Sequence, residues 1–111
     1  MSPDALPAIT HLQFLVLGML LAEPRAGRTI RRELVRHNVR RTAPAFYQMM
    51  ARLEDASLVE GWYDQNVVDG QLIKERHYRI RPAGRRAWNA TRDFYLGTLR
   101  GLVAAPEHGR G

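Results

Sequence analysis

Residues 40–61 read RRTAPAFYQMMARLEDASLVEG, a stretch typical of a capped helix that leads into a strand. Thr42 is a suitable N-cap, because its hydroxyl can accept hydrogen bonds from the free amides of the first turn. Pro44 follows near the helix start, where its missing N–H costs nothing. The apolar side chains recur at i, i+3, i+4 and i+7, which predicts one face directed at a core. They are Phe46, Met49, Met50 and Leu53.

The opposite face of this predicted helix carries Ala45, Gln48 and Arg52. Such a face can enter a DNA major groove, where glutamine can pair with adenine and arginine with guanine. Arg40 and Arg41, just before the cap, would then contact phosphates. A basic helix that simply faces solvent is the alternative, with Arg52 pairing with Glu54 or Asp55. The stretch alone does not decide between them.

The charge of the chain favours the nucleic-acid interpretation. The chain has 111 residues, enough for one domain with one core, and its formal net charge is +6. Between Arg25 and Arg52 there are eight arginines and a single acid, Glu33, so this window has a net charge of +7 and the remainder −1. A positive field confined to one segment indicates contact with nucleic acid. An anionic membrane surface and an acidic protein are the weaker alternatives.

The residues that enzymes and metal sites need are missing or scattered. The chain contains no cysteine, which excludes disulfides, thiolate metal sites and cysteine nucleophiles. The histidines lack ligand spacing; they are His11, His37, His77 and His108. There is no glycine-rich phosphate loop, serine elbow or carboxylate cluster. We therefore predict a protein that is not an enzyme, with no catalytic residue, metal or cofactor.

The apolar run Leu12–Ala22 is too short to span a bilayer. It is preceded by an acid, Asp4, and by no basic residue, unlike a secretory signal. A cytoplasmic protein with no membrane contact is therefore expected.

Two helices are predicted ahead of the opening stretch. Residues 1–9 contain two prolines and should form an N-terminal arm. Thr10 and Gln13 resemble a capping box that opens a helix over about 10–22, whose apolar residues lie on all sides. Burial against a second subunit, through Leu12, Leu15 and Met19, or a central place in the core would both explain this. A second helix over about 26–38 carries arginines on its solvent side, among them Arg28 as a phosphate contact.

Two β-like runs follow, over 58–65 and 72–80, separated by residues 66–71 with the common turn pair Asp69-Gly70. Three helices followed by a β-hairpin is the order of a winged helix-turn-helix. Such a hairpin would present Lys74 and Arg76 near its tip, where a wing meets the minor groove or the DNA backbone. Ordinary exposed strand charge is the alternative for these two residues.

Pro82 opens a last helix, over about 82–104, with one apolar and aromatic side. A helix that follows a complete compact module is most simply explained by a partner, and its period allows packing on a second copy of the chain. Trp88, Phe94 and Tyr95 would be dimer core or, less simply, line a pocket for a planar effector. The remaining residues predicted on this interface are Thr91, Leu99 and Leu102. Residues 105–111 should be a disordered tail.

The chain resembles the PadR family of bacterial transcriptional regulators over about residues 10–104. The residues that carry the resemblance are Tyr47, the run Arg52-Leu53-Glu54, Leu58-Val59, Tyr78-Arg79-Ile80 and Ala83-Gly84. The resemblance implies a winged-helix DNA-binding domain, a C-terminal dimerisation helix, and repression relieved when a small aromatic or hydrophobic compound, or another signal, binds.

The sequence departs from the family pattern at four places. Arg28 follows Gly27 where a tyrosine is usual, and Pro44-Ala45-Phe46 replaces a Gly-Thr-Leu run. Ser57 stands where glycine is common before the first strand, and Arg81 where threonine commonly opens the last helix. The two arginines add positive charge, so the DNA site need not resemble a typical family operator.

We therefore expect a mainly α protein with a small β-hairpin (α+β), divided into an arm (1–9), a winged helix-turn-helix (10–81), a dimerisation helix (82–104) and a tail. Its function would be sequence-specific binding of double-stranded DNA by a homodimer, as a repressor. The alternative is a winged-helix module whose basic face binds an acidic protein. Tyr47 could donate to a phosphate or pack against the wing. The full set of predicted DNA contacts is Arg28, Arg40, Arg41, Thr42, Ala45, Tyr47, Gln48, Arg52, Lys74 and Arg76.

Overall fold

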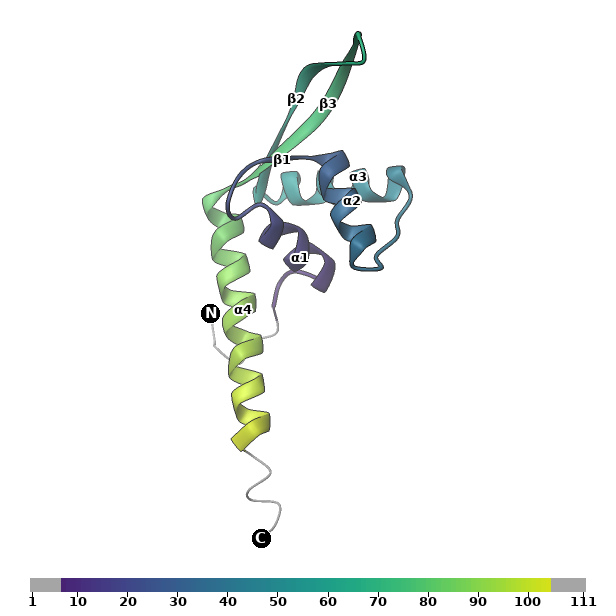
Figure 1. Ribbon diagram of the computed structural model, residues 1–111. Coiled ribbons are helices and arrows are strands. Elements are labelled where there is room, and N and C mark those ends of the chain that lie inside the picture. The colour runs from purple at the N-terminus through teal and green to yellow at the C-terminus, as the bar shows by residue number, and fades with distance from the viewer. Residues whose placement is uncertain (1–6, 105–111) are drawn as a thin grey trace.

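The computed structural model describes residues 7–104, with side chains described as far as Gly101. Most of the predicted arm and the whole predicted tail lie outside these residues. In chain order the elements are α1 (His11–Met19), β1 (Arg25–Ala26), α2 (Gly27–Arg36), α3 (Ala43–Asp55), β2 (Val59–Val68), β3 (Gln71–Ile80) and α4 (Pro82–Ala104). The first three helices form the body, the β2–β3 hairpin rises from it, and α4 runs away in the opposite direction (Figure 1). This is the predicted α+β winged-helix arrangement.

The core lies where α1, α2 and α3 meet the base of the hairpin. The predicted apolar face of α3 is confirmed, since all four of its residues are buried. They pack with residues of α1, α2, β2 and β3 in one cluster. The rest of that cluster is Val16, Leu17, Leu20, Ile30, Leu34, Val59 and Tyr78.

The start of α1 is as predicted, but its end is not. Thr10 and Gln13 form the capping box, with each backbone N–H donating to the other residue's side chain at 3.0 and 3.1 Å. The helix ends at Met19 and not near residue 22. The physical reason lies in β1, where Arg25 and Ala26 pair with Tyr78 and His77 of β3, so the chain must turn before it reaches them.

Helices α2 and α3 end in the same way. Each continues into a residue with a left-handed backbone, Asn38 at φ 62° and Ser57 at φ 61°. After α3, the amide of Ser57 donates to the carbonyl of Glu54 and that of Leu58 to the carbonyl of Leu53, both at 2.9 Å. This pattern satisfies carbonyls that a helix end otherwise leaves free. It also ends α2 at Arg36, two residues before the predicted end.

The sheet has the order β1-β3-β2 and is antiparallel throughout. The hairpin register runs from Val59 opposite Ile80 to Val68 opposite Gln71. The turn is the pair Asp69-Gly70 alone, with φ of 51° and 77°, as a two-residue hairpin turn of this twist requires. Both strands are therefore longer at the turn than the sequence predicted.

The longer hairpin corrects the predicted position of two basic residues. Lys74 lies opposite Gln65 and Arg76 opposite Tyr63, well down the strands from the turn. The prediction that both lie near the wing tip is therefore wrong. The reason is that the polar residues 66–71, which resemble a loop in sequence, mostly continue the ladder.

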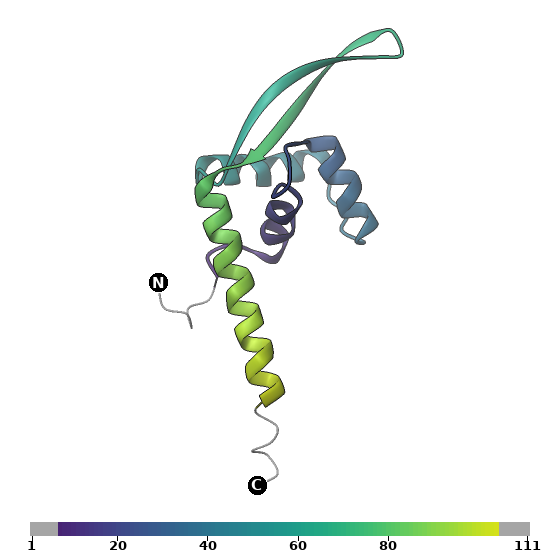
Figure 2. The same ribbon diagram turned by 60° about the vertical axis from the view of Figure 1, so that its left-hand side comes forward.

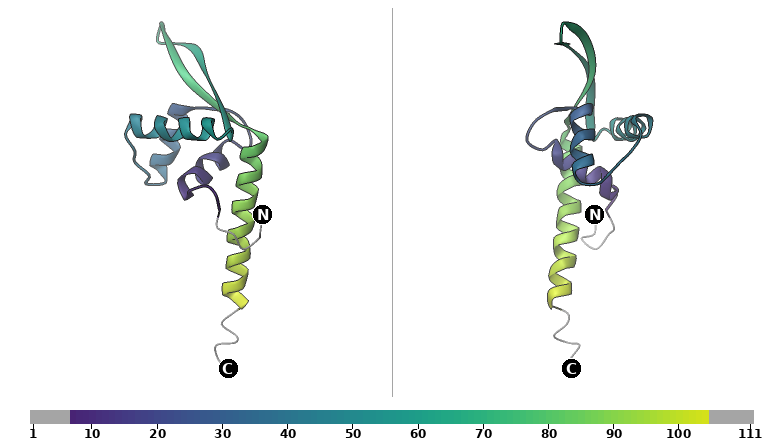
Figure 3. Two further views of the ribbon diagram at one scale, coloured as in Figure 1. Left: turned by 180° about the vertical axis from the view of Figure 1, so that it is seen from behind. Right: turned by 45° about the vertical axis from the view of Figure 1, so that its right-hand side comes forward.

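Helix α4 has its predicted bounds, and its described side-chain contacts with α1 extend from its start as far as Tyr95. Its start lies close to the loop before β2: a Cβ at Gly84 would stand 2.2 Å from the carbonyl oxygen of Leu58. Further along, the ring of Trp88 stacks on Phe14 of α1, with centroids 5.4 Å apart. The turned views agree that the C-terminal half of α4 extends past the other helices (Figures 2 and 3).

Candidate nucleic-acid interface

The exposed side of α3 carries the side chains that the sequence singled out for base contact. Gln48 and Arg52 are exposed, whereas Ala45 is half-buried. Thr42 accepts from the amide of Ala45 at 3.2 Å, so its hydroxyl caps the helix and fixes where α3 begins. The face is therefore presented to solvent from a rigid, capped helix.

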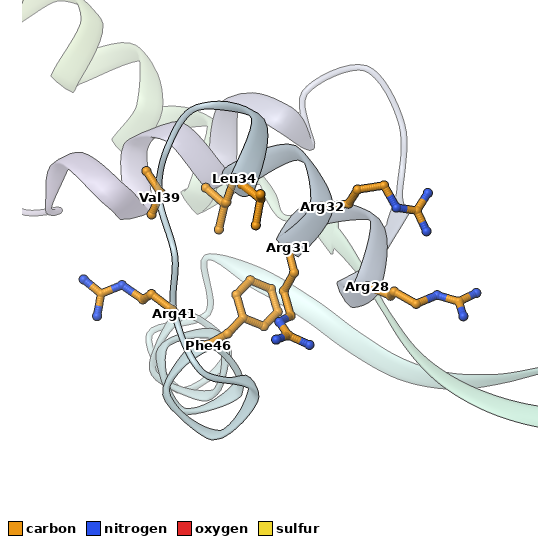
Figure 4. A pocket seen from close by; sticks show the side chains of 8 residues that line it. Arg28, Arg31, Arg32, Leu34, Val39, Arg41 and Phe46 are labelled. Atoms are coloured by element: carbon orange, nitrogen blue, oxygen red, sulfur yellow. The ribbon is translucent and has the colours of Figure 1, made fainter.

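Arginines flank this face on α2 and on the loop between the helices. Four of them line a hollow of about 230 Å³ whose floor is apolar, and none of its lining residues is acidic. The lining residues are Arg28, Arg31, Arg32, Leu34, Val35, Val39, Arg41 and Phe46. Figure 4 shows Arg28 and Arg32 pointing to one side and Arg41 to the other. The guanidinium groups do not converge on one point, which suits a charged polymer along the surface better than one small anion.

Arg31 and Arg32 were not among the predicted DNA contacts. With Arg28 they occupy positions i, i+3 and i+4 of α2, a spacing that places side chains on one face of a helix. That spacing is visible in the sequence. What it cannot show is that this face borders the start of α3.

A second hollow, a groove of about 700 Å³, separates α3 from the hairpin. Lys74 lies along it with its Nζ 4.7 Å from the centroid of the Tyr63 ring. Arg76 is an ion-pair partner of Glu54 at the end of α3, at 2.6 Å. The groove is lined by Arg28, Tyr47, Ala51, Glu54, Tyr63, Ile73, Lys74, Glu75, Arg76 and Tyr78.

The ion pair at the base of this groove affects the pKa values around it. Burial acts to lower the pKa of Arg76, but the hydrogen bond and charge of Glu54, together with Tyr78, outweigh it and raise that pKa. Burial raises the pKa of Tyr78 to about 12, and the Glu54 carboxylate adds to the shift while Arg76 opposes it. Arg76 therefore stays charged and held in its ion pair with Glu54, and Tyr78 stays neutral.

Two other residues that were predicted to contact DNA, Arg28 and Tyr47, make contacts within the chain. Arg28 forms an ion pair with Glu75 of β3, which links α2 to the hairpin. The half-buried Tyr47 packs edge-to-face on Phe46, with centroids 5.0 Å apart, and a Cβ at Gly27 would lie 2.9 Å from its ring. Arg40 and Arg41, by contrast, are fully exposed ahead of α3.

The predicted dimer surface is partly occupied by contacts within the chain. The Tyr95 hydroxyl and His11 Nε2 are hydrogen-bonded at 2.7 Å, and Tyr95 also packs near Phe94. Thr91 is only 2% exposed, with its hydroxyl donating to the carbonyl of Ala87. The Tyr95–His11 bond and the stacking of Trp88 on Phe14 join α1 to α4, so these aromatic residues of α4 are already half-buried in a single chain.

Apolar surface nevertheless remains on these two helices. Leu99 is 56% exposed, while Leu12, Leu15 and Met19 are half-buried. The side chain of Leu102 lies outside the described residues. A hollow of about 290 Å³ opens beside Trp88, and Phe94 and Tyr95 do not line it. Its lining is Phe14, Leu15, Gly18, Met19, Glu33, His37 and Trp88.

Among residues 7–104, no cluster of three or more histidine, aspartate or glutamate side chains could hold a metal ion. Within the same range, none of the helices combines the length and apolarity needed to cross a bilayer.

The comparisons with known proteins point to one fold. No protein-family model and no curated protein matches the sequence. A PadR family transcriptional regulator from Eggerthella lenta is similar in structure, with a TM-score of 0.67 and 25% identity over 86% of this chain and 81% of that one. This chain is a PadR-like winged-helix protein.

Two more structures share the PadR-like fold at lower identity. A PadR family regulator from Clostridium difficile has a TM-score of 0.61 and 16% identity over 92% of this chain and all of that one. Bacillus subtilis PadR, whose structure is of a complex with operator DNA, has a TM-score of 0.58 and 14% identity; the match covers 72% of this chain and 45% of that one. The PadR-like chains thus include one bound to DNA.

Proposed function

We propose that the protein is a homodimeric transcriptional regulator that binds operator DNA with α3 in the major groove. The observation that carries this proposal is the arginine-lined hollow of α2 and the α2–α3 loop, which has no acidic residue in its lining and borders a PadR-like α3. A helix of this kind fits the major groove, and the flanking guanidinium groups would lie against the phosphates.

The side chains divide into two roles. Gln48 and Arg52 would read base edges, because both are exposed on α3, Gln48 in its middle and Arg52 in its last turn. Phosphate contacts would come from residues around them, which position the protein and carry no sequence information. These are Arg31, Arg32, Arg40, Arg41 and Lys74. Arg28 and Arg76 are left out, because their charges are paired with Glu75 and Glu54.

Dimerisation would use α1 and the free half of α4. Leu99 is exposed on a part of α4 that extends past the other helices of the described chain, and a second copy would cover it. A two-fold dimer would place two copies of α3 on half-sites about one helical turn apart. Repression would follow from occupation of the operator.

The signal that releases the DNA would be a small aromatic or hydrophobic compound. The hollow beside Trp88 supports this part of the proposal, since it is mostly apolar and lies between α1, α2 and α4. A planar ligand there could stack on the indole and shift α4 relative to the DNA-binding helices.

Salt dependence of duplex binding tests the DNA part. Neutralising Arg31, Arg32 and Arg41 together as glutamines should reduce the slope of log affinity against log salt by about 2 to 3, since each phosphate contact contributes about 0.9. Arg100→Gln on the free half of α4 is the control and should leave the slope unchanged. An unchanged slope in the triple variant would contradict the proposal. Binding to an acidic protein with no duplex binding would favour the protein-interaction alternative.

A further inference from the structure

The hairpin has two chemically different faces. Side chains alternate along a strand, and residues opposite one another across a ladder share a face. One face therefore carries the pairs Tyr63–Arg76, Gln65–Lys74 and Val67–Leu72. The other face carries the pairs Asp64–Glu75, Asn66–Ile73 and Val68–Gln71. The first face is basic and apolar with no acid, whereas the second holds two carboxylates.

The acid-free face is the one directed toward α3. At the base of the hairpin the same face continues through Val59 and Tyr78, which are both buried in the core beneath α3. Higher up, Tyr63 and Lys74 line the groove whose other wall is α3. Ile73 and Glu75 of the second face also reach this groove, where Glu75 is paired with Arg28 of α2, so within the described residues the only unpaired charge that the hairpin contributes to the groove wall is that of Lys74.

The end of the acid-free face is apolar and uncovered. Val67 is 71% exposed and Leu72 is 66% exposed, although they are cross-strand neighbours of one another. The hairpin stands clear of the helices in every view (Figures 1, 2 and 3). Exposure of two large apolar side chains at the end of a projecting hairpin is unfavourable in water, and a binding partner would bury them.

We propose that Val67 and Leu72 form an apolar wedge that enters the DNA minor groove beside the segment bound by α3. The inference rests on the proposed function and deepens it, because it assigns the wing an uncharged contact. Apolar side chains in a minor groove partly unstack base steps and favour DNA that deforms easily. The wedge would therefore add sequence preference at base pairs that α3 does not touch.

The charges around the pair identify DNA as the partner. Lys74 stands two residues from Leu72 on the same strand and the same face, where it would meet a phosphate while the apolar pair enters the groove. The carboxylate of Asp64 lies on the opposite face, and the charge of Glu75 is paired with Arg28 of α2. Asp69 occupies the turn at the end of the hairpin. If the hairpin meets DNA through the face that carries Val67 and Leu72, and not through this turn, the Asp69 carboxylate does not approach the phosphates.

The test uses the full chain and a duplex that it binds. The G·C pairs just outside the α3 half-sites are replaced by inosine·cytosine pairs, which removes the guanine amino group from the minor groove and leaves the major-groove acceptors in place. Wild-type protein should bind the inosine duplex several-fold more tightly. The variant V67T/L72T keeps residues that suit a strand; it should lose roughly tenfold in affinity, as expected for the lost burial of two apolar side chains, and lose the response to inosine. V68T on the other face is the matched control and should behave as wild type.

Each outcome has one meaning. If wild-type protein binds no duplex, the proposed function fails and the wedge fails with it. If wild-type protein binds the duplex but V67T/L72T keeps both its affinity and its inosine response, the proposed function stands and the wedge is wrong. If V67T/L72T loses a self-association that wild type has, and binds DNA unchanged, the pair is a contact between copies and the proposal is overturned. Thermal unfolding of both variants at the wild-type temperature would establish that the hairpin is intact.

Discussion

The guanidinium of Arg76 lies 2.6 Å from the carboxylate of Glu54, and this ion pair fastens the wing to the end of α3. Both side chains are only a quarter exposed, so solvent screens the pair less than it would at the surface. The contact fixes the width of the groove between the two elements that the proposed DNA complex would use. Breaking it should change both stability and the position of the wing.

Replacing Glu54 with glutamine should lower the free energy of unfolding by about 1–2 kcal/mol, because Arg76 is left without its charged partner in a partly buried site. Urea unfolding measures this directly. Glu60→Gln is the matched control, since its pair with Arg79 is more exposed, at 41% and 60%, and should contribute less than about 0.5 kcal/mol. Equal losses in the two variants would contradict the role given to the Glu54–Arg76 pair.

The stability should fall at alkaline pH because of Tyr78. Its pKa is raised to about 12 in the folded chain from an ordinary 10.0. Above pH 10 the unfolded chain releases this proton first, so it binds fewer protons than the folded chain and the free energy of unfolding decreases up to about pH 12. The contribution is fully present below pH 10. Urea unfolding at several pH values should show a steeper fall for wild type than for Tyr78→Phe. A Tyr78→Phe variant with the wild-type slope would show that other groups cause the fall.

Ser57→Gly should stabilise the protein by about 1 kcal/mol. Ser57 has a left-handed backbone, which costs a residue with a Cβ about that much and costs glycine little. Asn38→Gly, at the equivalent place after α2, is the comparison and should gain less, because asparagine tolerates this conformation. Thermal or urea unfolding of the two variants would rank them. A destabilised Ser57→Gly would mean that its side chain contributes something that the backbone cost does not offset.

The local elements could be predicted from the sequence, because their signals are local. The cap at Thr42, the buried face of α3, the Asp69-Gly70 turn and the bounds of α4 each depend on residues close together in the chain. The two-residue strand β1 could not be predicted, since two residues carry no periodicity and pair only with β3, far along the chain. The predicted end of α1 was wrong for the same reason, because α1 must stop early enough for the chain to turn into β1.

The site was harder to predict than the fold. Arg76 was expected at the wing tip, but its partner Glu54 is 22 residues away in sequence, and only the folded chain brings the two together. Arg31 and Arg32 were expected on the solvent side of the second helix, beside the basic start of the third, but were not included in the set of predicted contacts; in the structure they line one hollow with Arg41. The departure at Ser57, noted as a difference from the family, coincides with a conformation that favours glycine. The DNA contacts themselves stay predictions.

The proposed dimer should depend on the free half of α4. Leu99→Glu should weaken self-association at least tenfold, because it would place a charge in an apolar contact between two copies. Its own fold should be unaffected, since Leu99 is 56% exposed in the single chain. Arg100→Glu, on another side of the same turn, is the control. Sedimentation at a series of concentrations measures both, and an unchanged mass for Leu99→Glu would count against α4 as the interface.

The most direct test of the central claim is selection of bound duplexes from a random library, with the affinities of the selected duplexes then measured at two salt concentrations. The account predicts enrichment of a two-fold symmetric sequence with half-sites about 10 base pairs apart, and steep weakening of binding at the higher salt. The same selection with Gln48→Ala should lose one preferred base in each half-site. A chain that binds no duplex at either salt concentration would contradict the account.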